Sequence, residues 1–210
     1  DLSQNNFGIS ELSMKHIKYL LKSNDTLLHL NLSNNKIGED YRSMRMLCET
    51  ISNCKYLKIL DLSYNFFCFC EDQMKIFYES FIENKTIKEL ILANNQIGLY
   101  LNATFIVRKI LICNNTIENI NLNNNFLGES KKGFENICEG LIMSRSIKNI
   151  YFVNNLISSR IENIEFLIDL FLYKKNLEEF DISENQLGNK YEFLRALYEN
   201  IGECNSLKNI

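Results

Sequence analysis

The sequence predicts an α/β solenoid in which a parallel sheet lines one face and helices cover the other. Three observations lead to this prediction. An asparagine recurs every 30 residues along the 210-residue chain, from position 5 to position 185. Apolar residues alternate just before each of these asparagines, which is the spacing of a strand with one buried face. Later in each 30-residue unit, apolar residues recur three and seven positions apart, which is the spacing of one helix face.

The strand half of each unit has the frame L-x-x-L-x-L-x-x-N-x-L, usually followed by glycine. Partial copies stand at both ends of the chain, and six full copies begin at residues 27, 57, 87, 117, 147 and 177. The frame resembles the leucine-rich repeat, and the match covers the whole chain without an insertion. The resemblance implies a horseshoe-shaped solenoid with a concave sheet.

Each position of the frame has a physical reason. Leu30 and Leu32 flank Asn31, so both point into the core while Asn31 points out. The amide of Asn35 can donate and accept hydrogen bonds, so a stack of such amides can satisfy backbone groups of neighbouring turns. Glycine recurs at positions 8, 38, 98, 128 and 188, which indicates a backbone that needs positive φ or close approach. Cys68 and Ser158 replace it, so glycine is preferred and not obligatory.

The other half of each unit predicts a helix outside the sheet. Met14, Ile17 and Leu21 form one apolar stripe, and equivalent residues return every 30 positions. A full helix in every turn resembles the ribonuclease-inhibitor-like subclass. We expect seven or eight short parallel strands on the concave face.

The chain is predicted to be a single domain, residues 1–210, with about seven repeats. Asp1 and Ile210 both occupy strand positions of the frame, and neither end has a polar capping repeat. Solenoids normally need such caps for solubility. We therefore expect the chain to be a segment of a longer repeat array, or its ends to be covered by partners.

Composition excludes several classes of protein. Lys and Arg number 23 against 26 Asp and Glu, and this slightly acidic balance does not suit binding to a nucleic-acid backbone. A hydrophobic fraction of 46% is too high for a disordered chain. No apolar run reaches the roughly 18 residues that a membrane span needs. We therefore expect neither a nucleic acid nor a membrane as partner.

The cysteines are expected to be reduced thiols of a cytoplasmic or otherwise intracellular protein. Their number, seven, is odd, and most fall in helical halves as core residues. Cys68 and Cys70 form the only close pair, and a metal site would need two more ligands nearby. His16 and His29 do not stand at a ligand spacing, so we expect no metal.

No motif for a catalytic centre or a cofactor occurs in the sequence. Phosphate-binding glycine loops, the serine nucleophile elbow and the zinc-binding H-E-x-x-H motif are all missing. Asp61 and Asp181 share the concave face, but four repeats separate them, which is too far for an acid–base pair. We therefore expect a protein that is not an enzyme and holds no cofactor.

A partner-binding surface is predicted from the outward strand positions and the loops that follow. Most of these positions are polar, and scattered apolar exceptions are ordinary on a protein surface. Clustered ones indicate a contact surface, and Glu179 and Glu184 rim the cluster on one side, which is compatible with a basic or mixed partner. The candidate residues are Ile59, Ile91, Phe126, Tyr151, Val153, Leu156 and Asp181.

Two functions remain open at this point. The first is a non-enzymatic interaction module or scaffold that binds a protein through its concave face and adjacent loops, as the resemblance implies. The alternative is a GTPase-activating protein that resembles the Ran GTPase activator, with Arg42 or Arg160 as the active arginine. Either arginine can equally be a solvated residue at the start of a helix.

Overall fold

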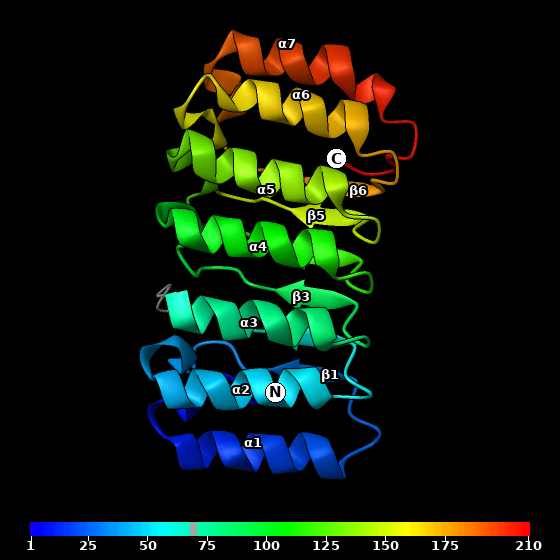
Figure 1. Cartoon of the computed structure of the whole chain (residues 1–210). Helices are drawn as coiled ribbons and strands as arrows, with labels where there is room; N and C mark the ends of the chain where they lie inside the picture. The colour runs from blue at the N-terminus through cyan, green and yellow to red at the C-terminus, as the bar shows by residue number, and fades with distance from the viewer. Residues whose placement is uncertain (68–70) are drawn as a thin grey trace.

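The computed structural model describes residues 1–67 and 71–210 and has the predicted solenoid architecture. Its parallel sheet has the strand order β1-β2-β3-β4-β5-β6. The α-helices stack in a single layer over one side of this sheet, with α1 and α7 at opposite ends (Figure 1). The prediction of seven or eight strands is wrong for the described residues, which form six. Asn209 makes only an isolated bridge with Glu179, and Leu2 only a backbone hydrogen bond to Asn31.

The elements repeat with little variation from turn to turn. The strands are β1 (His29–Asn31), β2 (Ile59–Asp61), β3 (Glu89–Ile91), β4 (Asn119–Asn121), β5 (Asn149–Tyr151) and β6 (Glu179–Asp181). The helices are α1 (Glu11–Ser23), α2 (Tyr41–Asn53), α3 (Glu71–Glu83), α4 (Leu101–Cys113), α5 (Lys131–Met143), α6 (Asn163–Tyr173) and α7 (Tyr191–Asn200). Short 3-10 turns precede or follow them: η1 (Phe7–Ile9), η2 (Ile37–Glu39), η3 (Ile97–Leu99), η4 (Leu127–Glu129), η5 (Ile157–Ser159), η6 (Leu187–Asn189) and η7 (Ile201–Glu203).

The core lies between the sheet and the helices, as the apolar pattern predicts. Leu30 and Leu32 are both buried, and Met14 on α1 is fully buried in the same core cluster. In the later turns phenylalanines take over, and the rings of Phe152 and Phe180 lie 5.7 Å apart in an edge-to-face contact. The core therefore runs unbroken along the solenoid, and each turn buries the apolar face of the next.

A ladder of buried asparagines joins the turns where the chain leaves each strand. The Asn95 amide donates to the carbonyl oxygens of Leu62 and Leu92, each at 3.0 Å. Its Oδ1 accepts from the backbone N–H groups of Asn65 and Phe66, at 2.9 and 3.1 Å. The same bonds recur between the neighbouring turns. The predicted role of these amides is confirmed.

The recurrent glycines serve close approach to the next turn, except at Gly188, and none of them serves positive φ. No glycine of the described chain has a positive φ. A Cβ on Gly128 would lie 2.1 Å from the carbonyl oxygen of Leu156 in the next turn, and one on Gly38 would lie 2.2 Å from the Cα of Phe67. The left-handed conformation falls instead on two non-glycine positions of each turn, two and four residues before the glycine position.

We predict that Asn95→Ala lowers the free energy of unfolding by about 3 kcal/mol or more, because it leaves several buried backbone groups without partners. The matched control is Asn115→Ala, an exposed asparagine in a helix-to-strand turn, which should change stability by less than about 0.5 kcal/mol. Urea unfolding monitored by circular dichroism measures both. Equal effects would show that the ladder does not hold the turns together.

Two glycine substitutions should separate close approach from backbone flexibility. Gly128→Ala places a methyl against backbone and should cost about 2 kcal/mol or more. Gly188 has no atom within 4 Å of an added Cβ, so Gly188→Ala should be neutral or stabilise by up to about 1 kcal/mol. Thermal unfolding of the two variants provides the comparison, and a similar loss in both would contradict the packing explanation.

Candidate protein-binding surfaces

The concave face, formed by the first and third residues of β1–β6, carries uncompensated negative charge. Its carboxylates are Asp61, Glu89, Glu179 and Asp181, and none of the six strands contains a lysine or arginine. The only other titratable groups on these positions are His29 and Tyr151. The concave face therefore favours a partner that brings positive charge.

Lysines line the edge of the sheet where the strands begin, but they neutralise neighbouring glutamates. Lys88 and Lys148 contact the two carboxylate oxygens of Glu118, at 2.7 and 3.1 Å. Both hydrogen bonds lower the pKa of Glu118. Lys208 contacts Glu178 in the same way, at 2.6 Å. These pairs are solvated, so they contribute little to stability, but they leave the strand carboxylates without a salt bridge.

Asp181 has a structural role that the sequence analysis missed. Its Oδ1 accepts from the backbone N–H and the hydroxyl of Ser183, at 3.0 and 2.7 Å, and this closes the turn out of β6. Asp61 closes the equivalent turn by accepting from the Ser63 N–H at 2.8 Å, and Asn31 and Asn121 do the same in their turns. One oxygen of Asp181 thus belongs to the turn, which leaves Oδ2 to face the concave surface.

Tyr151 breaks this turn pattern, as Ile91 does at the equivalent position of β3. A phenol cannot take the place of the Asx side chain, and the Val153 N–H donates instead to Oδ1 of Asn123 in the preceding turn, at 2.8 Å. Tyr151 is half-buried, and burial raises its pKa, with a further rise from the charge of Glu179 and a hydrogen bond to it. The side chain therefore presents a neutral hydroxyl and an apolar ring among carboxylates.

The predicted pair Ile59 and Ile91 is split by the register of the sheet. Ile59 lies opposite Glu89, and Asp61 lies opposite Ile91, so the two isoleucines are diagonal neighbours. Each is half-buried and flanked by a carboxylate. They form a smaller apolar site than direct pairing would give, and β4, with Asn119 and Asn121, separates them from Tyr151.

Phe126 and Leu156 lie in a separate groove at the strand exit. Its volume is about 290 Å³, and it does not include Tyr151, Val153 or either isoleucine. The structure adds two aromatic residues that the sequence analysis missed, Tyr64 and Phe66. All the lining residues are in the left-handed conformation, and they are Tyr64, Phe66, Asn94, Gln96, Asn124, Phe126, Asn154 and Leu156. We call this feature the rim groove.

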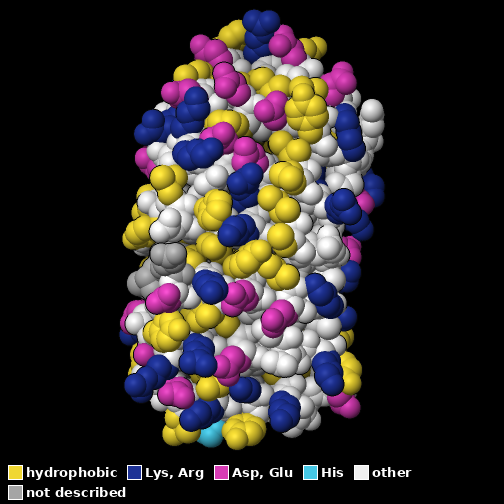
Figure 2. Space-filling model, viewed as in Figure 1, with side chains coloured by type: hydrophobic (Ala, Val, Ile, Leu, Met, Phe, Trp, Pro, Cys, Tyr) yellow, Lys and Arg dark blue, Asp and Glu magenta, His cyan; other side chains and the backbone are white. Residues whose placement is uncertain are grey.

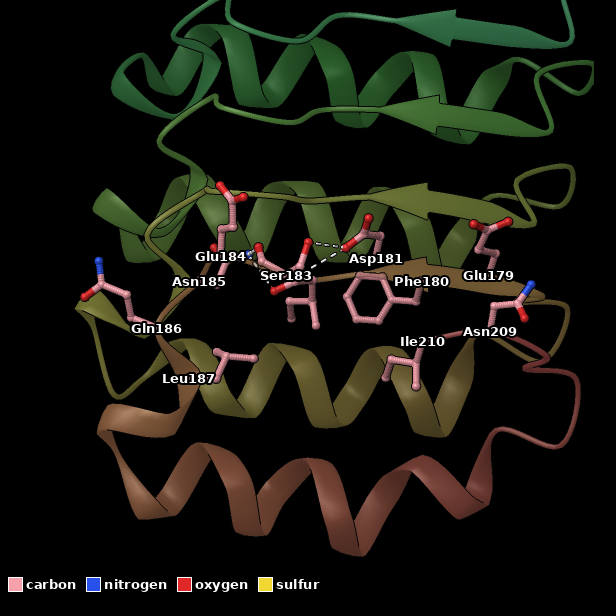
Figure 3. Close-up of a pocket in the computed structure, with 11 residues that line it drawn as sticks. Glu179, Phe180, Asp181, Ser183, Glu184, Asn185, Gln186, Leu187, Asn209 and Ile210 are labelled. Atoms are coloured by element: carbon pink, nitrogen blue, oxygen red, sulfur yellow. Dashed lines mark hydrogen bonds between the residues drawn. The ribbon is translucent and has the colours of Figure 1, made fainter.

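A second hollow, of about 630 Å³, lies beside β6 (Figure 3). Figure 3 shows Glu179, Asp181 and Glu184 on one side of the strand, and Phe180, Leu187 and Ile210 on the opposite side. Glu179 and Asp181 thus belong to the concave face, Glu184 to the strand exit, and the apolar side chains to the end of the core. The hollow therefore does not place an acid and a base where both could reach one bound molecule.

The convex face mixes charged and apolar side chains (Figure 2). Phe105, Met143 and Tyr173 are exposed there. The ammonium group of Lys109 lies 4.8 Å from the ring centre of Phe105 and 5.2 Å from that of Tyr78, so it covers part of this apolar surface. Charged side chains interrupt the apolar ones across the visible face.

The described residues offer no metal site, since no three His, Cys, Asp or Glu side chains gather in them. Cys48, Cys54, Cys113, Cys138 and Cys204 form no disulfide. Burial raises the pKa of Cys48 to about 12, so it is not a reactive thiolate. The predicted pair Cys68 and Cys70 lies outside the described residues.

Neither arginine of the GTPase-activator alternative stands out as a catalytic group. Arg160 donates from Nε to the Glu129 carbonyl oxygen at 2.6 Å, which fixes a turn. Arg42 is exposed at the start of α2. Burial raises the pKa of the neighbouring Asp40, but hydrogen bonds from Ser43, with a smaller contribution from Arg42, lower it overall. Both fit solvated residues near a helix start.

Comparisons with known proteins support the fold. No family model and no curated protein sequence matches the chain. Among solved structures, the tropomodulin C-terminal domain of Caenorhabditis elegans is similar, with 13% identity, a TM-score of 0.51 and coverage of 91% of this chain and 93% of that one. Leiomodin-1 actin-binding site 2 is also similar, with 15% identity, a TM-score of 0.55 and coverage of 91% and 86%.

The chain has the fold of a leucine-rich-repeat solenoid. At these identities the likeness concerns the fold. In the part of the chain that the structure describes, every helix is too short or too polar to cross a bilayer.

Phe126 should be replaceable by Asn at almost no cost in stability if it serves the surface and not the core. Its side chain is 39% exposed, and its φ of 57° suits Asn better than Phe. We expect Phe126→Asn to change the free energy of unfolding by less than about 1 kcal/mol, against a loss of about 3–5 kcal/mol for Phe152→Ala in the core. A loss above about 2 kcal/mol in urea unfolding would make Phe126 a packing residue.

Lys174 is buried, and its Nζ donates to the Ser144 carbonyl oxygen at 2.5 Å. Burial lowers its pKa from 10.5 to about 8. Above pH 8 the folded chain has lost this proton while the unfolded chain keeps it, so this lysine's contribution to stability rises with pH up to about 10.5.

The stability difference between wild type and Lys174→Met should therefore rise between pH 8 and 10.5, by up to about 3 kcal/mol, and stay constant below pH 7. Urea unfolding of both proteins at matched pH values isolates the contribution of this lysine. A difference that does not change with pH would show that Lys174 keeps its ordinary pKa.

Proposed function

We propose that the chain is a non-enzymatic protein-interaction module that binds a protein partner through its concave face and the adjacent loops. The observation that carries the proposal is the departure at Tyr151. Here the repeat gives up its Asx turn and places a half-buried aromatic ring among carboxylates. Aromatic residues on a rigid surface are typical anchors of protein interfaces. The surrounding charge favours a partner with basic residues.

The solenoid supports this function by its rigidity. The asparagine ladder and the continuous core hold the strand positions in fixed register, so side chains far apart in sequence form one preorganised surface. Helices of 10 to 13 residues in the turns support an assignment to the ribonuclease-inhibitor-like subclass. The free cysteines support an intracellular setting.

The test uses variants that the repeat itself tolerates. Tyr151→Asn restores the residue found at Asn121, and Asp181→Asn removes a charge but keeps the turn acceptor. The two substitutions are combined in the double variant Tyr151→Asn/Asp181→Asn. We expect the amount of each partner captured by wild type to be unchanged in Tyr173→Ala, a convex-face control, and at least tenfold lower in the double variant. Equal capture by the double variant would contradict the proposal.

Actin is the first defined partner to test, because the fold is shared with a structure described as an actin-binding site. Co-sedimentation with actin filaments, with wild type and the double variant side by side, measures this directly. Sedimentation that Tyr151→Asn/Asp181→Asn abolishes supports actin as the partner. Absence of sedimentation excludes filamentous actin and leaves the concave face to be matched with another protein.

A further inference from the structure

The rim groove carries an inference that rests on the proposed function and specifies one of its contacts. The groove is built from two rows of side chains over four consecutive turns. One row is Tyr64, Asn94, Asn124 and Asn154, and the other is Phe66, Gln96, Phe126 and Leu156. No lining residue carries a charge, in contrast to the acidic concave face beside it. The occupant should therefore be an uncharged segment.

The apolar residues of the groove hold a strained backbone conformation without being buried in the core. Phe66, Phe126 and Leu156 hold φ values of 47°, 57° and 57°, and the equivalent residues of other turns are Asn6, Lys36, Gln96 and Gln186. Bulky side chains are uncommon in this left-handed conformation. Phe66 and Phe126 remain 46% and 39% exposed, so burial in the core does not offset the strain. Such strain at an exposed apolar site points to contact with another molecule.

The polar lining supplies hydrogen-bond donors from its side chains, while the row that begins at Tyr64 has its backbone N–H groups already in use. The backbone N–H groups of Tyr64, Asn94 and Asn124 already donate to carbonyl oxygens of the next turn, at 2.9 to 3.0 Å. This row therefore cannot pair with an added β-strand through its own N–H groups. The side-chain amides of Asn94 and Gln96, both half-buried, have no partner within the described chain and remain available.

The dimensions select the conformation of the occupant. Four turns at about 4.8 Å spacing make a groove roughly 14 Å long, which matches about five residues of polyproline II at 3.1 Å each. Phe66 and Phe126 are two turns apart, about 10 Å, and one polyproline II turn spans about 9.3 Å.

We propose that the rim groove binds an uncharged, proline-rich segment in the polyproline II conformation, with prolines three residues apart. Two prolines pack on Phe66 and Phe126, because aromatic-lined grooves accommodate the pyrrolidine ring. The carbonyl oxygens between them, which polyproline II leaves free, accept from the amides of Asn94 and Gln96. Tyr64 and Leu156 complete the walls.

The probe is the fluorescently labelled, acetylated and amidated peptide (Pro-Pro-Ala)3-Pro, measured by fluorescence anisotropy against the whole chain. We expect saturable binding that weakens at least tenfold in Phe66→Asn/Phe126→Asn, two substitutions that the left-handed backbone tolerates. Phe105→Ala, an exposed phenylalanine on the convex face, should bind as wild type does. The flexible peptide (Gly-Ser-Ala)3-Gly should bind at least tenfold more weakly.

NMR on the wild-type chain provides a readout that does not depend on any variant folding. The side-chain amide signals of Asn94 and Gln96 should shift on peptide addition. No saturable binding, shifts confined to other residues, equal binding by the double variant, or equal binding of the flexible peptide would each overturn the proposal.

The outcome is separable from that of the concave-face test. Tyr151→Asn/Asp181→Asn should leave peptide affinity unchanged, because neither residue lines the groove. If Tyr151→Asn/Asp181→Asn loses partner capture and no protein tested binds the peptide, only the groove proposal is overturned. Peptide binding in the groove with unchanged partner capture overturns the concave-face proposal alone.

Discussion

The hydrogen-bonded asparagine ladder is the constraint on which the rest of the structure depends. At each strand exit the chain must turn away from the sheet inside a packed interior, where backbone N–H and C=O groups have no water. One asparagine side chain per turn satisfies donors and acceptors of its own turn and of its neighbours. The amide of Asn125, for example, donates to Leu92 in one direction, while its own N–H donates to Asn155 in the other. The turns are thereby locked in register.

This locked register explains why surface residues can vary while the scaffold does not. The equivalent turn is closed by Asn31, Asp61, Asn121 or Asp181 in four different repeats. A carboxylate and an amide are therefore interchangeable at this position in structure, although they differ in charge. Tyr151 shows that the turn can even lose its acceptor, because Asn123 from the preceding turn replaces it. The rigid asparagine ladder thus allows individual residues to differ from the repeat consensus. The residues that differ are the candidate binding residues.

The two candidate surfaces differ in chemistry. The concave face is acidic with one aromatic ring, and its carboxylates are not neutralised by the lysines at the strand entry, which pair with Glu118 and Glu178. The rim groove is uncharged and lined with amides and apolar side chains. A partner that used both would need a basic region next to a neutral, extended one. Such a combination would give more specificity than either surface alone.

The sequence by itself determined the solenoid, the helix in each turn and the role of the asparagines, because each follows from a periodicity of 2, 3.6 or 30 residues. Only the tertiary structure decided the rest, because it depends on contacts between turns. It showed that glycine at 38 and 128 serves close approach, and that Ile59 faces Glu89 instead of Ile91. It also separated Phe126 and Leu156 from Tyr151 and joined them to Tyr64 and Phe66. The direction of a side chain on a left-handed backbone residue does not follow from the period of a strand or a helix. The groove is therefore visible only when four turns are stacked in the structure.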